Sequence, residues 1–299
     1  MHVCPVPSTF DDRTLDQFAA GLPPWPPAGR LLVDAHGVTW TSPHGLVALL
    51  TLGQWVQEHG GEKPRLALPE SEDVRRYWAA AGFVDHAEAC YELHGRRPRG
   101  RPSGHSETML EVTKVGAAED VHEIVARIQT RASALLVGEL GLEAKATMGF
   151  AMALSEACQN IVEHAGTSGW VAVQAYHYRQ RLARKVAVIA VSDAGMGFRA
   201  SLEATQARNF GDRWRDGTAI EAALLRGTSR FRDPGRGQGL QGIRRYVSRW
   251  EGKLSVRSGT ARLAMVPAWD DEPPLAEALP FFPGAQVQIT IPGKDTARA

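Results

Sequence analysis

The fold of this chain is decided by residues 153–165, which read Ala-Leu-Ser-Glu-Ala-Cys-Gln-Asn-Ile-Val-Glu-His-Ala. We expect a helix from Thr147 to Ala165, which places Glu156, Asn160 and His164 four residues apart and therefore on one face. The apolar stripe beside this polar one consists of Phe150, Leu154, Ala157 and Ile161. One face of the helix can thus pack on a sheet while its neighbour lines a polar cleft. A carboxylate and a carboxamide in such a cleft can handle a metal-bound phosphate chain.

A second segment, residues 192–198, reads Ser-Asp-Ala-Gly-Met-Gly-Phe and directly follows a β-branched run over Val186 to Val191. An aspartate at the end of a buried strand, here Asp193, can accept a hydrogen bond from an exocyclic amine. Gly195 and Gly197 let the backbone pass close to a flat ring or a phosphate. Many turns share this pattern, so a plain turn is the alternative interpretation.

A third segment, residues 235–243, reads Gly-Arg-Gly-Gln-Gly-Leu-Gln-Gly-Ile and is expected to open a helix that continues through Val247. Glycines before a helix N-terminus leave backbone N–H groups free to hold anionic oxygens, assisted by the helix dipole. No Gly-Lys-Ser/Thr follows, which excludes a Walker A loop. Neither a preceding strand nor a following βαβ unit supports a dinucleotide fold.

Taken together and in this order, the three segments resemble the GHKL ATP-binding fold. This superfamily, with its Bergerat-type fold, includes histidine-kinase catalytic domains, ATPase subunits of type II topoisomerases, Hsp90 and the anti-sigma-factor serine kinases. The resemblance covers about residues 106–299. It implies an α/β sandwich of class α+β, with helices on one face of a mixed sheet, and it implies ATP and Mg²⁺ as ligands.

The resemblance also implies a role for each matching residue. Asn160 is similar to the asparagine whose amide oxygen binds Mg²⁺ between the phosphates, and Glu156 to the general base that orients water or a protein hydroxyl. Asp193 is similar to the adenine-reading aspartate. His164 either contacts phosphate or packs and caps the helix end. The loops around the base and the triphosphate correspond to Gly195, Gly197, Arg236, Gly237, Gly239 and Leu240.

Residues 199–234 lie between the second and third segments and would form the ATP lid, with an amphipathic helix over Thr218 to Gly227. From residue 199 to 249 the chain has eleven arginines, no lysine and five acidic residues, a surplus of six positive charges. This surplus could hold polyphosphate or an acidic partner, or the arginines could form a solvated helix face. Arg236 is the first candidate for phosphate because it lies inside the glycine loop.

One departure from the family pattern lies at the last strand. Gly284 is followed by Ala285, where relatives often carry a threonine that helps to bind adenine. Loss of one hydrogen bond, worth about 1 kcal/mol, would weaken nucleotide binding without abolishing it. ATP or ADP therefore remains the expected ligand.

The other elements of residues 106–299 are expected to complete one sheet and its helices. A strand is predicted over Met109 to Val115 and a helix over Asp120 to Leu140. Trp170 to Tyr178 and Val186 to Val191 flank a polar run, which predicts an antiparallel hairpin. The strands expected near the C-terminus are Lys253 to Arg257, Ala261 to Val266 and Ala285 to Ile291.

We expect residues 1–93 to form a small α/β domain. Strands and helices alternate, and helical crossovers imply parallel pairing of the strands. The expected segments are a β-like His2 to Pro7, helical spacing over Phe10 to Leu22, strands Arg30 to Val33 and Arg65 to Leu68, and helices Gly45 to His59 and Asp73 to Ala81. Residues 94–105 carry four arginines, three glycines and two prolines. They favour a solvated linker over a basic patch for nucleic acid or membrane.

Residues 32–46, followed by an apolar helix, resemble the STAS domain of anti-sigma-factor antagonists. They read Leu-Val-Asp-Ala-His-Gly-Val-Thr-Trp-Thr-Ser-Pro-His-Gly-Leu. In that family an Asp-Ser-Ser-Gly turn carries the phosphoacceptor serine, whereas proline occupies the acceptor position here. Pro43 suits the first helical position and Ser42 the N-cap, so we expect a degenerate STAS-like domain. Ser42 as a substitute acceptor is the alternative.

The composition argues against a protein that binds nucleic acid, spans a membrane, is rich in disulfides or holds a transition metal through its own side chains. Apolar residues make up 43% of the 299 residues, and a formal net charge of +1 gives no sign of a direct nucleic-acid partner. The longest apolar run, Leu46 to Leu52, is far below the roughly 20 residues that span a bilayer, so we expect a cytoplasmic protein without membrane contact. Cys4, Cys90 and Cys158 are too scattered for a disulfide framework, and the histidines form no metal-binding cluster.

Three functions follow from the resemblances. The first is an Mg-ATP-dependent serine/threonine protein kinase of the partner-switching type, whose partner is a STAS antagonist or a sigma-factor-like regulator. The second is a catalytically weak, nucleotide-dependent signalling switch regulated by its fused STAS-like domain. A mechanical ATP hydrolase is disfavoured because no transducer domain is present, and a histidine kinase because no helical hairpin precedes Glu107. The partner's identity and the formation of a homodimer stay open.

Overall fold

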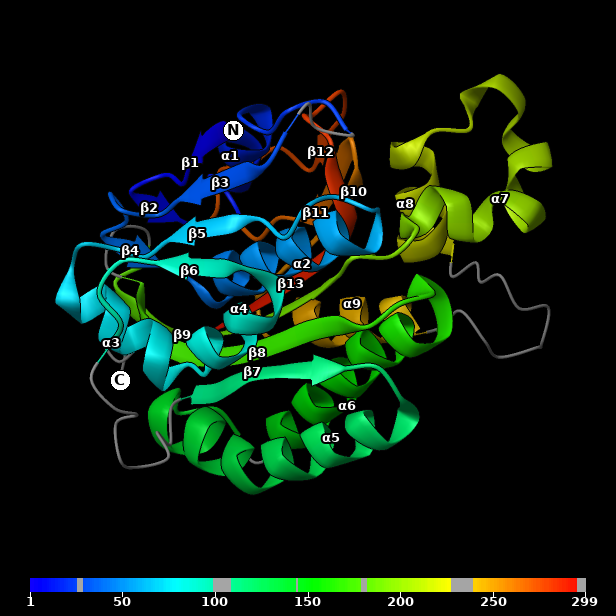
Figure 1. The fold of residues 1–299 in the computed structure, drawn as a ribbon. Helices are drawn as coiled ribbons and strands as arrows, with labels where there is room; N and C mark the ends of the chain where they lie inside the picture. Colours follow the sequence, from blue (N-terminus) through cyan, green and yellow to red (C-terminus); the bar gives the residue numbers. More distant parts are fainter. Residues whose placement is uncertain (26–28, 99–108, 144, 179–181, 227–238, 295–299) are drawn as a thin grey trace.

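A computed structural model describes residues 1–25, 29–98, 109–143, 145–178, 182–226 and 239–294. The described strands form a four-stranded sheet, a seven-stranded sheet and a small two-stranded one. One long helix, α2 (Pro43–Glu58), lies between the two large sheets (Figure 1). This helix is buried on nearly every side, as expected for a sequence that is apolar all round.

The four-stranded sheet is built by residues 2–94 and is wholly parallel. Its strands lie in the order β1-β3-β5-β6, and each neighbouring pair runs in the same direction. The predicted parallel α/β layer is thus confirmed, because helical crossovers return the chain to the same edge. Its elements, besides α2, are β1 (His2–Pro5), β2 (Thr9–Phe10), α1 (Leu15–Ala20), β3 (Leu31–Asp34), β4 (Trp40–Thr41), β5 (Arg65–Ala67), α3 (Glu72–Ala80), α4 (Phe83–Cys90) and β6 (Glu92–His94).

The helix predicted over Phe10 to Leu22 is shorter in the structure. Phe10 belongs to β2, which pairs with β4, and α1 begins only at Leu15. Between them Asp11 forms a local turn, because its Oδ1 accepts backbone N–H groups of Arg13 (3.0 Å) and Thr14 (3.1 Å). An aspartate that bonds its own backbone competes with the helix, and this turn delays the helix start.

The seven-stranded sheet lies in the order β12-β11-β10-β13-β9-β8-β7. Every pair of its described strands is antiparallel, so the predicted mixed sheet is wrong, whereas the predicted hairpin of β8 and β9 is confirmed. The strands are β7 (Met109–Val115), β8 (Gly169–Tyr178), β9 (Arg184–Asp193), β10 (Lys253–Gly259), β11 (Ala261–Met265), β12 (Leu275–Ala276) and β13 (Phe282–Pro292). The helices of this part are α5 (Ala118–Ala132), α6 (Lys145–Asn160), α7 (Gly197–Phe210), α8 (Asp216–Arg226) and α9 (Gly239–Arg249).

Both long helices predicted before β8 end in a π-helical segment. α5 is followed by Ser133–Glu139, and α6 by Ile161–Ala165, after which Gly166 adopts a positive φ of 76°. Because a π-helix bonds residues five apart, it changes the angle between successive side chains. His164 is therefore rotated from the place that a continuous α-helix would give it beside Glu156 and Asn160.

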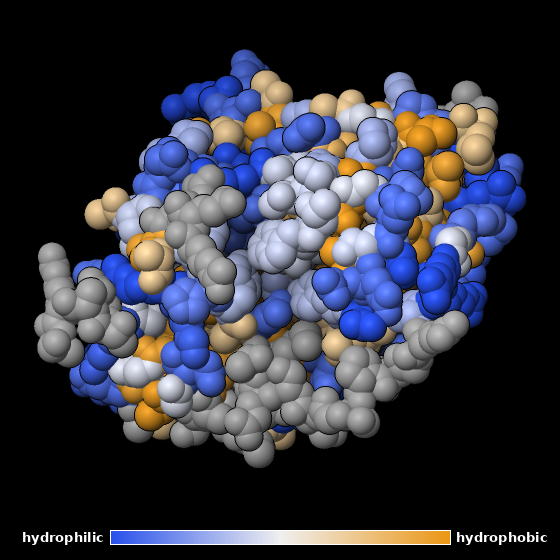
Figure 2. Space-filling view, turned by 90° about the vertical axis from the view of Figure 1, so that its left-hand side faces the viewer, coloured by the Kyte–Doolittle hydropathy of each residue, from blue (hydrophilic) through white to orange (hydrophobic). Residues whose placement is uncertain are grey.

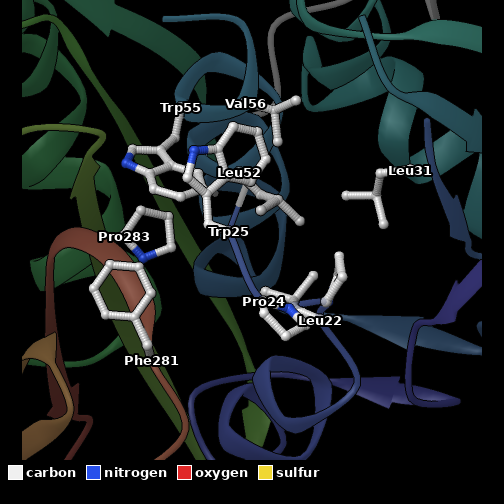
Figure 3. A pocket seen from close by; sticks show the side chains of 10 residues that line it. Leu22, Pro24, Trp25, Leu31, Leu52, Trp55, Val56, Phe281 and Pro283 are labelled. Atoms are coloured by element: carbon white, nitrogen blue, oxygen red, sulfur yellow. The ribbon is translucent and has the colours of Figure 1, made fainter. Parts of the chain in front are cut away.

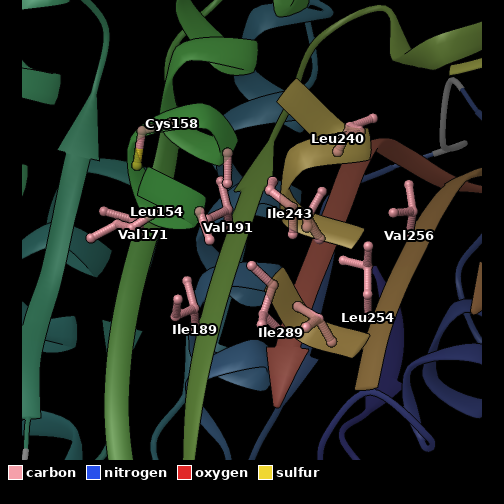
Figure 4. Close-up of a cluster of buried hydrophobic side chains, with 14 of the residues drawn as sticks. Leu154, Cys158, Val171, Ile189, Val191, Leu240, Ile243, Leu254, Val256 and Ile289 are labelled. Carbon is pink, nitrogen blue, oxygen red and sulfur yellow. The ribbon is translucent and has the colours of Figure 1, made fainter. Parts of the chain in front are cut away.

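The large sheet separates two apolar cores. Strand alternation sends Val171 and Ile189 into the core beneath α5, α6 and α9 (Figure 4), while Trp170 and Ala190 enter the core around α2. The two parts of the chain therefore share one continuous apolar interior on the α2 side. The division into residues 1–93, 94–105 and 106–299 stays a prediction, and residues 99–108 lie outside the described residues.

A buried group of charges joins the N-terminal part to β10 and β11. The Nζ of Lys253, which is 3% exposed, lies 3.3 Å from Oδ2 of Asp12 and 3.3 Å from Oδ2 of Asp270, and it also contacts Glu272. Burial opposes the charge of Lys253, but the neighbouring carboxylates Asp12 and Glu272 outweigh it and raise its pKa. Such a cluster is stable only while every charge keeps its partner.

One face of the molecule shows a mainly polar surface. The face at the left of Figure 1 is mostly hydrophilic, with apolar residues scattered among polar ones (Figure 2). Scattered apolar residues are usual on protein surfaces. No helix in the described ranges is long and apolar enough to cross a membrane.

Candidate functional site

Asp193 ends β9 at the point where three strands align. It is paired with Gly169 of β8 on one side and with Ala285 of β13 on the other. Its side chain is buried, and its Oδ1 accepts the backbone N–H of Gly195 at 2.9 Å. Burial raises the pKa of Asp193 to about 6, although hydrogen bonds from the backbone N–H groups of Gly195 and Ala285 oppose the shift. The carboxyl group is therefore held in one orientation in a site of low polarity.

The two glycines after Asp193 are needed for close packing. A Cβ at Gly195 would collide with the carbonyl group of Ala165, whose oxygen accepts the backbone N–H of Met196 at 3.2 Å. Gly197 has a φ of 71°, and a Cβ there would lie 2.5 Å from Oγ of Ser258. The Asp193 turn thus meets the end of the helical segment that begins at α6.

Two residues that hold this turn had no role in the sequence-based prediction. Gly284 has a φ of 70°, and a Cβ there would collide with the carbonyl oxygen of Asp193. Ser258, which is buried, donates its hydroxyl to the carbonyl of Gly284 (3.0 Å) and accepts the backbone N–H of Phe198 (3.1 Å). Gly284 was noticed only for the alanine that follows it, and a lone serine in a strand gives no signal of this kind.

The α6 wall carries Glu156 and Asn160 one helical turn apart. Glu156 is exposed, and its pKa is raised first by partial burial and then by the charge of Glu163. The Nδ2 of Asn160 is buried and has no hydrogen-bond partner within the described part of the chain. A buried amide without a partner is costly, so this side chain is suited to a ligand.

His164 lies in the π-helical segment that follows Asn160. Its Nε2 is 3.9 Å from Oε2 of Glu163, and the side chain is largely buried. Ala165, the next residue, is the one that Gly195 packs against. The structure thus brings His164 to the junction of the α6 wall and the Asp193 turn.

The third segment is described only in part. Gly239 begins α9, and Leu240 is buried in the same core as Leu154 of α6 (Figure 4). The predicted helix through Val247 is confirmed. Arg236 and Gly237 lie outside the described residues.

The predicted lid is likewise described only up to Arg226. The helix expected over Thr218 to Gly227 is present as α8, and its Ile220 and Leu224 are completely buried. A helix packed in this way is part of the core and not a freely hinged flap. A lid role for residues 227–234 stays a prediction, because those residues are outside the described ranges.

Helix α2 supports the Asp193 turn from the opposite face of the sheet. Thr51 donates its hydroxyl to Oγ of Ser192 at 2.7 Å, with both side chains buried. The Nε2 of Gln54 donates to the carbonyl of Ser168 at 3.0 Å, while its Oε1 accepts the indole N–H of Trp170 at 2.8 Å. The N-terminal part therefore contacts the residue before Asp193 and the loop after Ala165.

A family comparison agrees with this geometry. Residues 146–294 match the family model described as histidine kinase-, DNA gyrase B-, and HSP90-like ATPase. Residues 146–294 are therefore similar to an ATPase domain of this kind. A search of curated protein sequences finds no match.

The donor set around Asn160 fits a metal held mainly by phosphate. Among the described residues, no three His, Cys, Asp or Glu side chains gather closely enough to bind a metal ion by themselves. A magnesium ion keeps water and phosphate ligands and needs only one or two protein oxygens. The carboxamide oxygen of Asn160 could supply one of them, while its buried Nδ2, an N–H donor without a partner in the described part of the chain, would suit a phosphate oxygen.

Proposed function

We propose that the protein is an Mg-ATP-dependent protein serine/threonine kinase of the partner-switching type. The observation that carries the proposal is the placement of Glu156 and Asn160 on the helix whose π-helical end, at Ala165, meets the Asp193 turn. This arrangement offers a base, a carboxamide and a buried carboxyl group on adjoining walls. Phosphoryl transfer needs mainly such positioning and charge stabilisation.

Each wall would act on a different part of the nucleotide. Asp193 would accept the exocyclic amine of adenine, because its carboxyl group is already oriented by backbone N–H groups. Asn160 would hold Mg²⁺ with the phosphates, and the ion would neutralise the charge that develops on them. His164 and the glycines at 195, 197, 237 and 239, with Arg236 and Leu240, would complete the contacts to base and phosphates.

Glu156 would orient the hydroxyl group of a protein substrate. It is exposed, so a partner's side chain can reach it, and its raised pKa brings it closer to the range useful for a base. The attacking hydroxyl would pass its proton to Glu156 as the bond to the γ-phosphorus forms and the bond to the leaving ADP oxygen breaks.

The substrate would be a STAS-like antagonist or a sigma-factor-like regulator supplied in trans. Ser42 of the chain's own STAS-like part is 2% exposed, and its Oγ accepts the backbone N–H of Gly45 at 3.2 Å. With Pro43 at the first helical position, Ser42 acts as a helix cap. A buried cap is a poor phosphoacceptor, which supports a degenerate STAS-like domain with a regulatory role.

The second candidate function is a nucleotide-dependent signalling switch with little turnover. The bond between Thr51 and Ser192 and the contacts of Gln54 favour it, since the N-terminal part reaches the back of the site. In this case nucleotide binding and the state of the N-terminal part would be linked, and the partner would sense the bound form. Cytoplasmic location and a homodimer also remain proposals.

The nucleotide site is tested by isothermal titration with ADP and ATP, with and without Mg²⁺. We expect Asn160→Ala to weaken ATP binding at least tenfold with Mg²⁺ and to reduce the benefit of the ion. Met148→Ala is the matched control, because Met148 lies on the same helix twelve residues before Asn160 and is 72% exposed. Absence of nucleotide binding to the unaltered protein would overturn the site.

Phosphoryl transfer is tested with labelled ATP, Mg²⁺ and candidate STAS partners. The kinase proposal expects transfer that Glu156→Gln abolishes while ATP binding persists. Transfer that survives in Glu156→Gln would show that Glu156 is not the base. A different result would be that no partner is phosphorylated, while partner binding depends on nucleotide in the unaltered protein and in Glu156→Gln alike. That result would identify the protein as a nucleotide-dependent signalling switch.

A further inference from the structure

An apolar cavity lies where the N-terminal part meets the start of β13 (Figure 3). Its volume is about 420 Å³, within the range of small-molecule sites. Trp25, Trp55 and Phe281 form its aromatic part, with Pro283 and Phe281 beside Trp55, and Leu31 lies on the far side. The cavity is separate from the Asp193 turn and plays no part in the proposed transfer reaction.

The lining defines the chemistry of a ligand. The rings of Trp25 and Trp55 lie 4.4 Å apart between centroids, and those of Trp55 and Phe281 lie 6.0 Å apart. The remaining walls are aliphatic or proline, and no residue of the lining carries an ionisable side chain. A charged ligand would lose its hydration here without gaining a partner, whereas a neutral flat ring would gain aromatic contacts.

The cavity shares both of its main elements with the nucleotide site. On α2, Leu52, Trp55 and Val56 line the cavity, while Thr51 of the same helix bonds Ser192 beside Asp193. On the other side, Phe281 and Pro283 directly precede Gly284, whose backbone lies against Asp193. A ligand that shifts α2 or the start of β13 would therefore move groups that hold the Asp193 turn.

We propose that this cavity binds a neutral, flat aromatic small molecule and that its occupancy changes the affinity of the protein for nucleotide. The coupling to nucleotide affinity rests on the proposed function of Asp193 as a nucleotide ligand. The binding of an aromatic molecule rests only on the cavity. The N-terminal part would then serve as the sensor of the ATP-binding domain.

The ligand site is tested by fluorescence titration of the full chain with N-phenyl-1-naphthylamine, a neutral aromatic probe, in the absence of nucleotide. We expect saturation at one probe per chain. Phe281→Ala and Trp25→Ala should each raise the dissociation constant of the probe about tenfold, which corresponds to about 1.4 kcal/mol of binding free energy. Trp40→Ala is the control, because Trp40 is 37% exposed, belongs to the same part of the chain and lies outside the cavity.

Thermal unfolding of each variant shows whether it is folded. Phe281 is 52% exposed, so its replacement decides the result even if Trp25→Ala fails to fold. Probe binding that is unchanged in Phe281→Ala, or that rises without saturation, would overturn the ligand site. Non-saturable binding would indicate non-specific adsorption of the probe to apolar surface.

The coupling is tested by titrating ADP with and without saturating probe. We expect the dissociation constant of ADP to change at least fivefold, and the change to shrink in Phe281→Ala. An unaltered ADP affinity with the probe bound would overturn the coupling. Absence of ADP binding in both states would overturn the proposed nucleotide function and the coupling together, while the fluorescence titration would still decide the ligand site.

Discussion

Two polar sites on opposite faces of the seven-stranded sheet, one beside α2 and one at the end of α6, differ in how their hydrogen bonds are satisfied. On the α2 face, Ser192 is bonded to Thr51, and Gln54 uses both ends of its amide on Ser168 and Trp170. On the helix face, the amide of Asn160 has no described hydrogen-bond partner at Nδ2. Asp193 follows Ser192 directly and, by strand alternation, belongs to this helix face. One residue step therefore separates Ser192, which is bonded to a side chain of α2, from Asp193, which is bonded to backbone N–H groups at the candidate site.

At these two sites the difference is between polar groups that support the fold and an amide that lies beside the candidate site with a donor unpaired among the described residues. A buried group whose partners come from the protein helps to specify the fold, as Thr51 and Ser192 do. A buried group without a protein partner is costly to keep and is a candidate for binding. Substitutions on the two faces of the sheet should therefore have different effects, and those on the α2 side should mainly change stability.

The largest effect is expected from Lys253→Met, which breaks the buried charges beside the N-terminal part. Three carboxylates would lose their shared cation, so the free energy of unfolding should fall by about 3–5 kcal/mol in urea titrations. Arg76→Met is the control, because Arg76 and Glu72 form an exposed ion pair. That change should cost less than about 1 kcal/mol. Equal losses in the two variants would contradict a special role for the buried cluster.

Gly284→Ala should have the next largest effect and tests the helix face. It combines a φ of 70° with a collision against Asp193, so we expect a loss of about 3 kcal/mol together with strongly weakened ADP binding. Gly60→Ala is the matched control, since Gly60 has a φ of 76° and open space around it. Gly60→Ala should lose only the stability that backbone strain costs, and its affinity for ADP should be that of the unaltered protein.

Asp193→Asn should change the pH dependence of stability. The folded pKa of about 6 lies above the ordinary value of 3.8, so the folded state binds the proton more tightly. Its contribution to stability is therefore fully present at low pH and is lost as the pH rises through 6. Between pH 4 and 7.5 the unaltered protein should lose roughly 2 kcal/mol relative to the variant, measured without nucleotide. Parallel curves would show that Asp193 titrates normally, and ADP binding at pH 7.5 should be lost in the variant.

Thr51→Val should have the smallest effect and tests the support behind the site. Removing the hydroxyl leaves Oγ of Ser192 without its partner, which costs about 1 kcal/mol. We also expect a small loss of ADP affinity. Thr205→Val is the control, because Thr205 bonds only a carbonyl of its own helix. A larger change in ADP affinity for the control than for Thr51→Val would refute support of the site through α2.

Local patterns predicted much of the fold. The periodicity around Glu156 and the β-branched runs of β8 and β9 identified the helix and the hairpin, and the alternating elements of residues 1–93 identified a parallel layer. The π-helical end of α6 was missed because apolar spacing does not distinguish it from an α-helix over a few residues. The antiparallel character of the whole large sheet was missed because strand order depends on long-range pairing, which local spacing does not encode.

In the candidate site, too, local spacing predicted the residues of one turn but not the distant residues that pack against it. Asp193, Gly195 and Gly197 form a local motif, so their shared turn could be expected from spacing alone. Ser258 and Gly284 hold that turn from β10 and β13, more than sixty residues further along the chain. Nothing local in the sequence marks a serine that joins β13 to the start of α7, since its role exists only once these elements are packed together.

By itself, the sequence determined many of the helices and strands, the resemblance to an ATPase domain and the candidate residues for a nucleotide, because these depend on spacing within one helix, strand or turn. Only the tertiary structure decided that α2 lies behind Asp193, that Lys253 joins the two parts, and that an aromatic cavity borders the start of β13. Those features come from packing between distant segments. Their physical basis is the burial of α2 on both sides, which no single stretch of the chain specifies.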